Sequence, residues 1–301
     1  MGEITEALRR AKLRRDSKKE EDPYVEGAPR ESAVVRAGLN GPPPSERAVP
    51  DAVPIDEVAK EDVEIASIPR TRSGPWPARA VLLDPHQPHT EHFRRFALQV
   101  RQELQSRETT SVLVTSPVRS EGKTFTACNL ALALASMAAG GRISLLELDA
   151  RRPAVSQGLG VDPRVGIEEV IVGAASLEAA RIYTELPSLD LYLVREPPAE
   201  PHEILARPSL AAIFRALGAH YDAVVVDSPP VLLVPDVSLI LGHVGACVAV
   251  VRAGVSRLRA ARDMFEQLPG KKLLGVFVND ISAVRRSEQY GYYYSAEDES
   301  Q

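Results

Sequence analysis

The residues with the clearest chemistry lie at positions 116–124, where the sequence reads S-P-V-R-S-E-G-K-T. An apolar run precedes this stretch, and the helix-like run Phe125 to Ala139 follows it. A strand, a tight glycine loop and a helix N-terminus make a cradle for phosphate, because the first helical amides point at the anion. Lys123 would reach the outer phosphates and the Thr124 hydroxyl would bind Mg²⁺. This stretch therefore predicts a nucleotide-phosphate site.

The stretch departs from the general pattern G-x-x-x-x-G-K-[ST], because Pro117 stands where the first glycine is expected. Taken alone, the Gly122-Lys123-Thr124 tripeptide is equally compatible with plain capping of a helix. The apolar strand before it and the Ala/Leu-rich helix after it favour phosphate binding. Other segments must decide between the two interpretations.

A first acidic partner is Asp227, which ends the apolar run Y-D-A-V-V-V-D and precedes Ser228-Pro229-Pro230. A carboxylate at the end of a strand can orient the water shell of a Mg²⁺ ion that Thr124 and the phosphates carry. Capping of the next turn is the alternative role for Asp227, but the loop upstream favours the metal site.

A second acidic strand end is L-L-E-L-D-A-R-R-P, residues 145–153. Alternate residues of a strand share a face, so Glu147, Asp149 and Arg151 are expected to point together at the nucleotide edge. Such a set can shape the metal's water shell, take a proton from an acceptor and balance charge. Alone, it would also fit a surface run of salt bridges.

Elements that position these residues can be predicted from apolar runs and helical periodicity. Apolar strands that alternate with helices indicate an α/β fold, a mostly parallel sheet covered by helices on both faces. Ligands of such sheets lie beyond the carboxyl ends of the strands, where the three motifs would meet. The expected strands are 80–83, 112–115, 143–148, 189–194, 223–227, 246–251 and 273–278, and the expected helices are 90–107, 123–139, 201–217, 236–242 and 257–268.

Composition narrows the function classes. The chain has 301 residues, 44% of them hydrophobic, and a formal charge of −5, which argues against nucleic-acid binding. Cys128 and Cys247 lie in apolar runs and are expected to be buried thiols of a reducing compartment. The apolar run from Leu130 to Ala139 is too short to cross a bilayer, and the charged N-terminus is unlike a signal peptide. We therefore expect a cytoplasmic protein with no membrane span of its own.

The first eighty residues differ from the rest. Residues 1–20 carry apolar side chains at helical spacing among many charges, which predicts a short amphipathic helix. A solvated helix is favoured over a docking element for a partner or the membrane surface. Residues 21–79 are rich in proline and lack periodicity, so we expect a disordered linker. The catalytic domain is then expected over residues 80–284, with a flexible tyrosine-rich tail at 285–301.

Together, S-P-x-x-x-E-G-K-T, L-L-E-L-D-A-R-R-P and Y-D-A-V-V-V-D-S-P-P-V-L resemble the bacterial tyrosine kinases of capsule and exopolysaccharide assembly, which are P-loop proteins. Further matches are Asp84-Pro85, Gly166 to Val170 and Gly275 to Asn279. The resemblance runs from about Val81 to Tyr294 and leaves out the first eighty residues. It implies an ATP- and Mg²⁺-dependent protein-tyrosine autokinase that regulates polysaccharide polymerisation and export.

The tail fits this resemblance, because four of the eight tyrosines lie within residues 290–294. By itself such a cluster would fit a sticky or disordered segment. The resemblance implies that Tyr290, Tyr292, Tyr293 and Tyr294 are autophosphorylation sites. Extended chain from Ile281 to Tyr294 spans about 45 Å, enough to reach the nucleotide site of a neighbouring subunit.

The predicted site residues fall into four groups. Catalysis is assigned to Lys123, Asp149, Glu147 and Asp227, and the metal to Thr124, Glu147 and Asp227. An oligomer interface is assigned to Glu91 and Arg94. The predicted nucleotide contacts are Ser116, Ser120, Glu121, Gly122, Lys123, Thr124, Phe125, Arg151 and Asn279.

Three departures from the family pattern leave an alternative open. Glu147 replaces an aspartate, Ser120 replaces a glycine, and the oligomerisation pattern E-x-x-R-x-x-R ends on Ala97. If Glu147 is too long for its role, Glu147→Asp should raise activity. The alternative is a pseudokinase or nucleotide-switched ATPase that binds a membrane partner. For either function, the resemblance implies a membrane-embedded polysaccharide co-polymerase as activator, recruitment to the inner membrane face, and an opposing tyrosine phosphatase.

Overall fold

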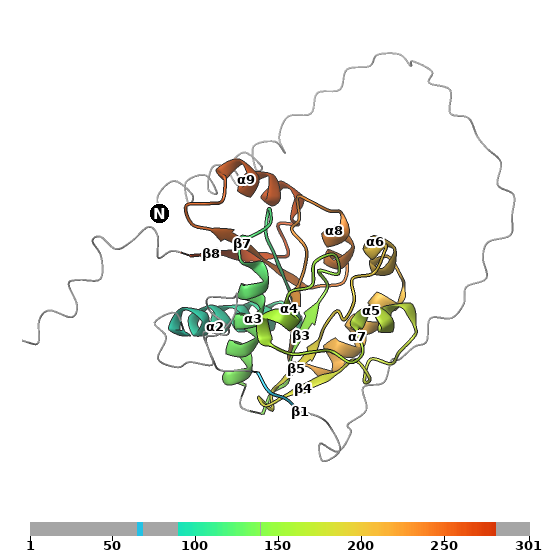
Figure 1. Cartoon of the computed structure of the whole chain (residues 1–301). Helices are drawn as coiled ribbons and strands as arrows, with labels where there is room; N and C mark the ends of the chain where they lie inside the picture. Colours follow the sequence, from blue (N-terminus) through green and yellow to red (C-terminus); the bar gives the residue numbers. More distant parts are fainter. Residues whose placement is uncertain (1–64, 69–89, 139, 281–301) are drawn as a thin grey trace, which may run out of the picture. The chain divides into compact units, whose positions relative to one another are not determined.

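An eight-stranded sheet organises the described part of the chain (Figure 1). The structure is a computed structural model, and it describes residues 65–68, 90–138 and 140–280. In chain order its elements are β1 (Ile65–Ala66), α2 (Thr90–Ser106), β2 (Ser111–Thr115), α3 (Lys123–Ser136), β3 (Ile143–Glu147), α4 (Val155–Leu159), α5 (Ile167–Val172), β4 (Ile182–Thr184), β5 (Leu189–Tyr192), α6 (Pro201–Leu205), α7 (Ser209–His220), β6 (Ala223–Asp227), α8 (Asp236–Leu241), β7 (Ala246–Arg252), α9 (Leu258–Gln267) and β8 (Leu273–Asn279).

The strand order is β1-β4-β5-β3-β6-β2-β7-β8, and every neighbouring pair is parallel except β4 with β5. β2 therefore lies in the interior of the sheet, between β6 and β7. The carboxyl ends of β3, β6, β2, β7 and β8 meet along one edge, as parallel strands require. Register brings Glu147 opposite Asp227 and Val114 opposite Asp227. The topology thus collects the predicted motifs at one edge of the sheet.

Both faces of the sheet are covered by helices. One hydrophobic core lies between the sheet and α2, α3 and α4, and the other between the sheet and α5 to α9. Successive residues of β2 enter opposite cores, with Val112 and Val114 on the first face and Leu113 on the second. Burying each such side chain contributes about 1.5–3 kcal/mol. The near-continuous apolar strands are explained by this two-sided burial.

The predicted α/β sheet with helices on both faces is confirmed, with corrections in detail. The helix predicted over 201–217 is two helices, α6 and α7, because Pro208 lacks an N–H and disfavours a helical conformation at the residue before it. Sequence reasoning missed the short elements β1, β4, α4 and α5. The strand predicted at 80–83, the segment 1–20 and the tail lie outside the described residues. Of the predicted disordered linker 21–79, residues 65–68 are described, and there the chain forms β1, paired with β4, and buries Ile68.

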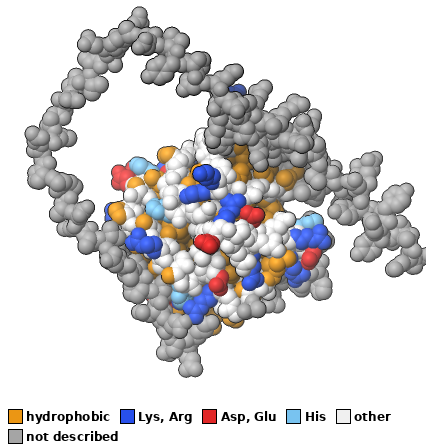
Figure 2. Space-filling view, turned by 180° about the vertical axis from the view of Figure 1, so that it is seen from behind, with side chains coloured by type: hydrophobic (Ala, Val, Ile, Leu, Met, Phe, Trp, Pro, Cys, Tyr) orange, Lys and Arg blue, Asp and Glu red, His pale blue; other side chains and the backbone are white. Residues whose placement is uncertain are grey.

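Cys128 and Cys247 are buried free thiols, as expected. Burial raises the pKa of Cys247 to about 11 and the pKa of Cys128 well above its usual value. Of the helices in the described ranges, none has the length and apolar character that crossing a membrane requires. On the face seen in Figure 2, acidic and basic side chains are interspersed among the coloured residues.

Candidate functional site

The phosphate-binding loop connects β2 to α3, as its sequence predicts. The Ser116 hydroxyl donates to the Val118 carbonyl at 2.8 Å, which closes the start of the loop. Gly122 is the N-cap of α3 and has φ 92°, a left-handed conformation that favours glycine. The amides at the start of α3 are thereby presented at the end of a 14-residue helix, where an anion is favoured.

Close packing against β8 gives Gly122 a second reason to be glycine. A Cβ atom added at Gly122 would lie 1.9 Å from the side-chain nitrogen of Asn279. That nitrogen donates to the Glu121 carbonyl at 3.0 Å, so the amide of Asn279 holds the loop from outside. Asn279, which the sequence predicts as a nucleotide contact, therefore contacts the backbone of the loop itself.

Replacing Gly122 by alanine is expected to destabilise the fold by about 2–3 kcal/mol, because the substitution adds a clash to a left-handed φ. Gly173→Ala is the matched control, since Gly173 has φ 81° and no atom within 4 Å of an added Cβ. The control should lose only about 1 kcal/mol. Urea unfolding of both variants measures the difference, and equal losses would show that contact with Asn279 does not constrain the loop.

Three of the predicted catalytic and metal residues converge on Lys123. Its ammonium lies 2.7 Å from an oxygen of Asp149, 3.8 Å from an oxygen of Asp227, and 3.0 Å from the Thr124 hydroxyl. Burial lowers the pKa of Lys123, but Asp227 and Asp149 outweigh this effect and raise it overall. The lysine is therefore charged, and it compensates two carboxylates at the N-terminus of α3.

Asp227 is the most unusual of these groups. It is fully buried, and neither carboxylate oxygen has a hydrogen-bond partner among the described residues. Burial raises the pKa of Asp227 to about 6, although Lys123 opposes the shift. A buried acceptor without donors is costly, and a divalent cation would relieve that cost. The arrangement of Asp227 beside Thr124 therefore fits a Mg²⁺ site.

Hydroxyl groups fix the segment after Asp227 against β2. The Thr115 hydroxyl donates to the Pro229 carbonyl at 2.9 Å, and the Ser228 hydroxyl donates to the Val114 carbonyl at 3.0 Å. Backbone amides of residues 231 and 232 donate to the carbonyls of Ser116 and Pro117. The loop after β6 and the phosphate-binding loop are thus held as one unit, which presets the site.

Glu147 has a different position from the one predicted. One carboxylate oxygen accepts the backbone N–H groups of Ala154 and Val155 at 2.7 and 2.9 Å, and the other accepts the N–H of Val194 at 3.1 Å. Burial raises the pKa of Glu147 to about 7 despite these hydrogen bonds. Glu147 therefore joins the segments that follow β3 and β5, and its assignment to the metal is replaced by a positioning role.

These contacts lead to an expectation opposite to the one from sequence. Glu147→Asp shortens the side chain by about 1.5 Å, so it should leave buried N–H groups unpaired and lower the free energy of unfolding by about 2 kcal/mol. Phosphorylation, if present, should fall with it. Urea unfolding at pH 7 and a phosphotyrosine assay measure the two effects. A more active variant of unchanged stability would restore the metal role of this position.

Arg151 also differs from prediction. Its guanidinium binds Asp236 on α8 through two hydrogen bonds of 2.7 and 3.2 Å, and Asp236 is buried. Glu147, Asp149 and Arg151 therefore have three separate partners and do not act as one set. The predicted nucleotide contact through Arg151 requires release from Asp236.

The remaining predicted nucleotide contacts mainly support the phosphate-binding loop itself. Glu121 is buried and its carboxylate accepts the N–H of Arg252 at 2.7 Å. The ring of Phe125 packs edge-to-face on Phe93 with centroids 5.7 Å apart, so only its backbone can face a nucleotide. Ser120 has φ 64°, the left-handed conformation that a glycine would adopt more readily.

Known proteins that resemble this chain include tyrosine-protein kinases. No established family model matches it. The tyrosine-protein kinase YwqD of Bacillus subtilis (strain 168) is 29% identical over 214 residues, 70% of this chain and 89% of that protein. The tyrosine-protein kinase ptk of Acinetobacter johnsonii is 29% identical over 194 residues, 64% of this chain and 26% of that protein. The crystal structure of the chimerical protein CapA2B2 has a TM-score of 0.62 at 26% identity and covers 71% of this chain and 92% of that one.

The chain is similar to bacterial tyrosine-protein kinases over about two thirds of its length. It spans about a quarter of the length of several relatives it matches, and nearly all of others. The tyrosines at 290 and 292–294 lie outside the described residues.

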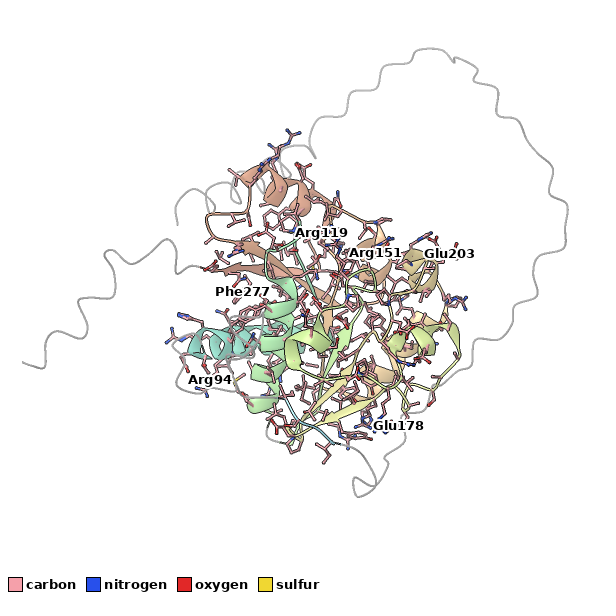
Figure 3. The ribbon with its side chains drawn as sticks, in the orientation of Figure 1. Arg94, Arg119, Arg151, Glu178, Glu203 and Phe277 are labelled. Carbon is pink, nitrogen blue, oxygen red and sulfur yellow. The ribbon has the colours of Figure 1, made fainter. Side chains whose placement is uncertain are left out.

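The residues that the sequence assigns to an oligomer interface lie on α2. Glu91 and Arg94 are exposed and pair with each other at 3.2 Å, and Ala97 is buried in the core. Figure 3 shows Arg94 well away from Arg119 of the phosphate-binding loop and from Arg151. An interface through this helix remains a prediction.

Sequence reasoning missed three charged residues that border the predicted site. Asp236 holds Arg151, and Arg252 pairs with Asp280 at 2.8 Å. The Asn279-Asp280 pair was visible as polar residues directly after an apolar strand, which is the same signal that Asp149 and Asp227 carry. Asp236 gave no such signal, because an acid at the start of a helix is usually a solvated favourable charge.

Proposed function

We propose that the chain is an ATP-dependent protein-tyrosine kinase that phosphorylates tyrosines of its own tail. The observation that carries this proposal is the convergence of Lys123, Asp149, Thr124 and Asp227 at the N-terminus of α3. The buried carboxylate of Asp227 accepts no hydrogen bond from the described residues. The names of the relatives in the shared region support the same activity.

When bound, Mg²⁺-ATP supplies the transferable phosphoryl group and a cation that neutralises its charge. Thr124 and Asp227 would hold the cation, and the amides of the loop would bind phosphate. Lys123 would compensate the negative charge that develops on the phosphate oxygens. These are electrostatic roles, so the buried position of the residues strengthens them.

Asp149 would accept the proton of the tyrosine hydroxyl. In the structure its carboxylate is paired with Lys123 at 2.7 Å, which blocks this role. Lys123 must therefore leave Asp149 for the phosphates before the carboxylate can act as a base. Asp149 would therefore act as a base when nucleotide phosphates bind Lys123, and not when the phosphate-binding loop is empty.

The direct test incubates the purified chain with Mg²⁺-ATP and measures phosphotyrosine. We expect a signal that is lost in a chain truncated before Tyr290, while nucleotide binding to that chain is unchanged. Phosphorylation of the truncated chain at full level would show that the tail tyrosines are not the acceptors. Absence of any phosphotyrosine, alone or with added membrane-partner segments, would reject the kinase.

A nucleotide-switched binding protein is the second candidate. The position of Glu147 favours this second candidate. Its carboxylate accepts hydrogen bonds from three backbone amides, so it would not take part in holding Mg²⁺. The two candidates differ in the same assay. Nucleotide binding without phosphotyrosine would favour the switch, which would then act by changing the affinity for a partner.

The wider role would be the control of polysaccharide polymerisation and export. Supporting this are a succinoglycan biosynthesis transport protein of Rhizobium meliloti (strain 1021), 29% identical over 234 residues, and the CapA2B2 chimera. We propose a cytoplasmic chain that a membrane-embedded co-polymerase recruits and activates, with a tyrosine phosphatase reversing the modification. Co-purification with cytoplasmic segments of a candidate co-polymerase tests the first partner.

A further inference from the structure

The end of β8 is bound directly to the phosphate-binding loop. The amide nitrogen of Asn279 donates to the Glu121 carbonyl at 3.0 Å, and the amide oxygen of Asn279 accepts the N–H of Asp280 at 2.9 Å. One side chain therefore joins the loop to the last described residue of the chain. Residues 281–301, which include the tyrosine-rich tail, follow Asp280 in the sequence.

Arg252 at the end of β7 makes a second connection between the same two places. Its backbone N–H donates to the buried carboxylate of Glu121 at 2.7 Å and to the Ser256 hydroxyl at 2.6 Å. The Ser256 hydroxyl in turn donates to Glu121. The guanidinium of Arg252 binds one carboxylate oxygen of Asp280 at 3.0 and 2.8 Å. Arg252 thus contacts the loop with its backbone and Asp280 with its side chain.

Asp280 has φ 56°, in the left-handed region. A non-glycine residue adopts this conformation at a cost of about 1–2 kcal/mol, which aspartate tolerates better than most. The hydrogen bond that the Asp280 N–H donates to Asn279 and the ion pair with Arg252 hold Asp280 in this conformation. The backbone of Asp280, the last described residue, is therefore held next to the phosphate-binding loop.

We propose that Arg252 and Asp280 are positioning residues that fix the root of the tyrosine-rich tail at the phosphate-binding loop and so direct the tail to the site of phosphoryl transfer. This inference rests on the proposed kinase function. It concerns presentation of the tail and involves no contact of Arg252 or Asp280 with the nucleotide.

The ion pair is better suited to positioning than to stabilising the fold. The side chains of Arg252 and Asp280 are 39% and 34% exposed, and pairs at such exposure contribute about 0–1 kcal/mol to stability. A tethered acceptor reacts at an effective concentration set by where its tether begins and how long it is. Releasing the root lowers that concentration for the tail and leaves a free peptide substrate unaffected.

The experiment compares two acceptors in one reaction. Full-length Asp280→Ala and Arg252→Ala are incubated with Mg²⁺-ATP and a free tyrosine-containing peptide, and phosphorylation of the tail and of the peptide is measured separately. We expect tail phosphorylation to fall about fivefold relative to the peptide, in line with a lowered effective concentration. Nucleotide affinity and the peptide rate should stay at the wild-type level.

Three further variants sharpen the comparison. Asp280→Asn keeps an acceptor oxygen and tolerates the left-handed conformation, so it should retain about half of the tail signal. The double variant should be no worse than the poorer single one, since the two residues act through each other. Arg262→Ala is the matched control, because it removes an exposed ion pair with Glu266, 3.2 Å long, on α9 and should leave both rates unchanged.

The outcomes separate this inference from the proposed function. Equal loss of tail and peptide phosphorylation, or an unchanged ratio of the two, would overturn the positioning role. An additive double variant would also overturn it. Failure of the wild-type chain to phosphorylate either acceptor would instead reject the kinase function itself.

Discussion

Lys123→Met is expected to reduce tyrosine phosphorylation at least about 100-fold, the loss typical of removing a main charge-stabilising group. Methionine is close to lysine in length and keeps the apolar stem, so the substitution removes the ammonium and little else. That ammonium lies 2.7 Å from Asp149 and 3.8 Å from Asp227 in the resting structure. The variant therefore loses both the charge that would stabilise the phosphate oxygens and the partner that holds Asp149.

The same substitution has a structural cost that must be measured separately. Without Lys123, the buried carboxylates of Asp149 and Asp227 face each other without a cation, and breaking such a pair costs about 3–5 kcal/mol. Circular dichroism and urea unfolding of the variant show how much folded protein is present. Full phosphorylation by a folded Lys123→Met chain would remove Lys123 from the mechanism.

The parts of the fold that could be predicted from sequence are those with a strong periodic signal. The apolar strands β2, β3, β6 and β7 are buried on both faces, so their composition alone marks them. α4, α5 and β4 are six residues or shorter, and such elements form because the surrounding structure holds them. Their own sequences carry too little periodicity to predict them.

At the site, the backbone positions were predictable and the side-chain partners were not. Parallel topology alone requires the carboxyl ends of β2, β3 and β6 to meet, which brings Lys123 to Asp227. Glu147 shows the limit of this reasoning. A glutamate is long enough to reach the amides of Ala154 and Val155, and the sequence does not show that those amides are within reach.

Asp227→Asn is expected to have opposite effects on activity and on stability. Phosphorylation should fall about 100-fold or more, because an amide binds Mg²⁺ more weakly than a carboxylate does. The free energy of unfolding at pH 8 should rise by on the order of 1 kcal/mol. The reason is that the wild-type carboxylate is fully buried without a hydrogen-bond donor among the described residues. Asp162→Asn, at an exposed aspartate, is the control and should change neither quantity.

The pH dependence of unfolding tests directly whether Asp227→Asn raises the free energy of unfolding. Burial raises the pKa of Asp227 from 3.8 to about 6, so the folded chain binds this proton more tightly than the unfolded chain. Wild-type stability from this group is therefore greatest below pH 3.8 and declines as the pH rises to about 6. Glu147 shifts in the same direction mainly through burial, but the charge of Asp227 also raises its pKa, so removing that charge in the variant adds to the same trend. Urea unfolding of both proteins from pH 4 to 8 should show the variant gaining over wild type as the pH increases, and a constant difference would mean that ionisation of Asp227 does not strain the fold.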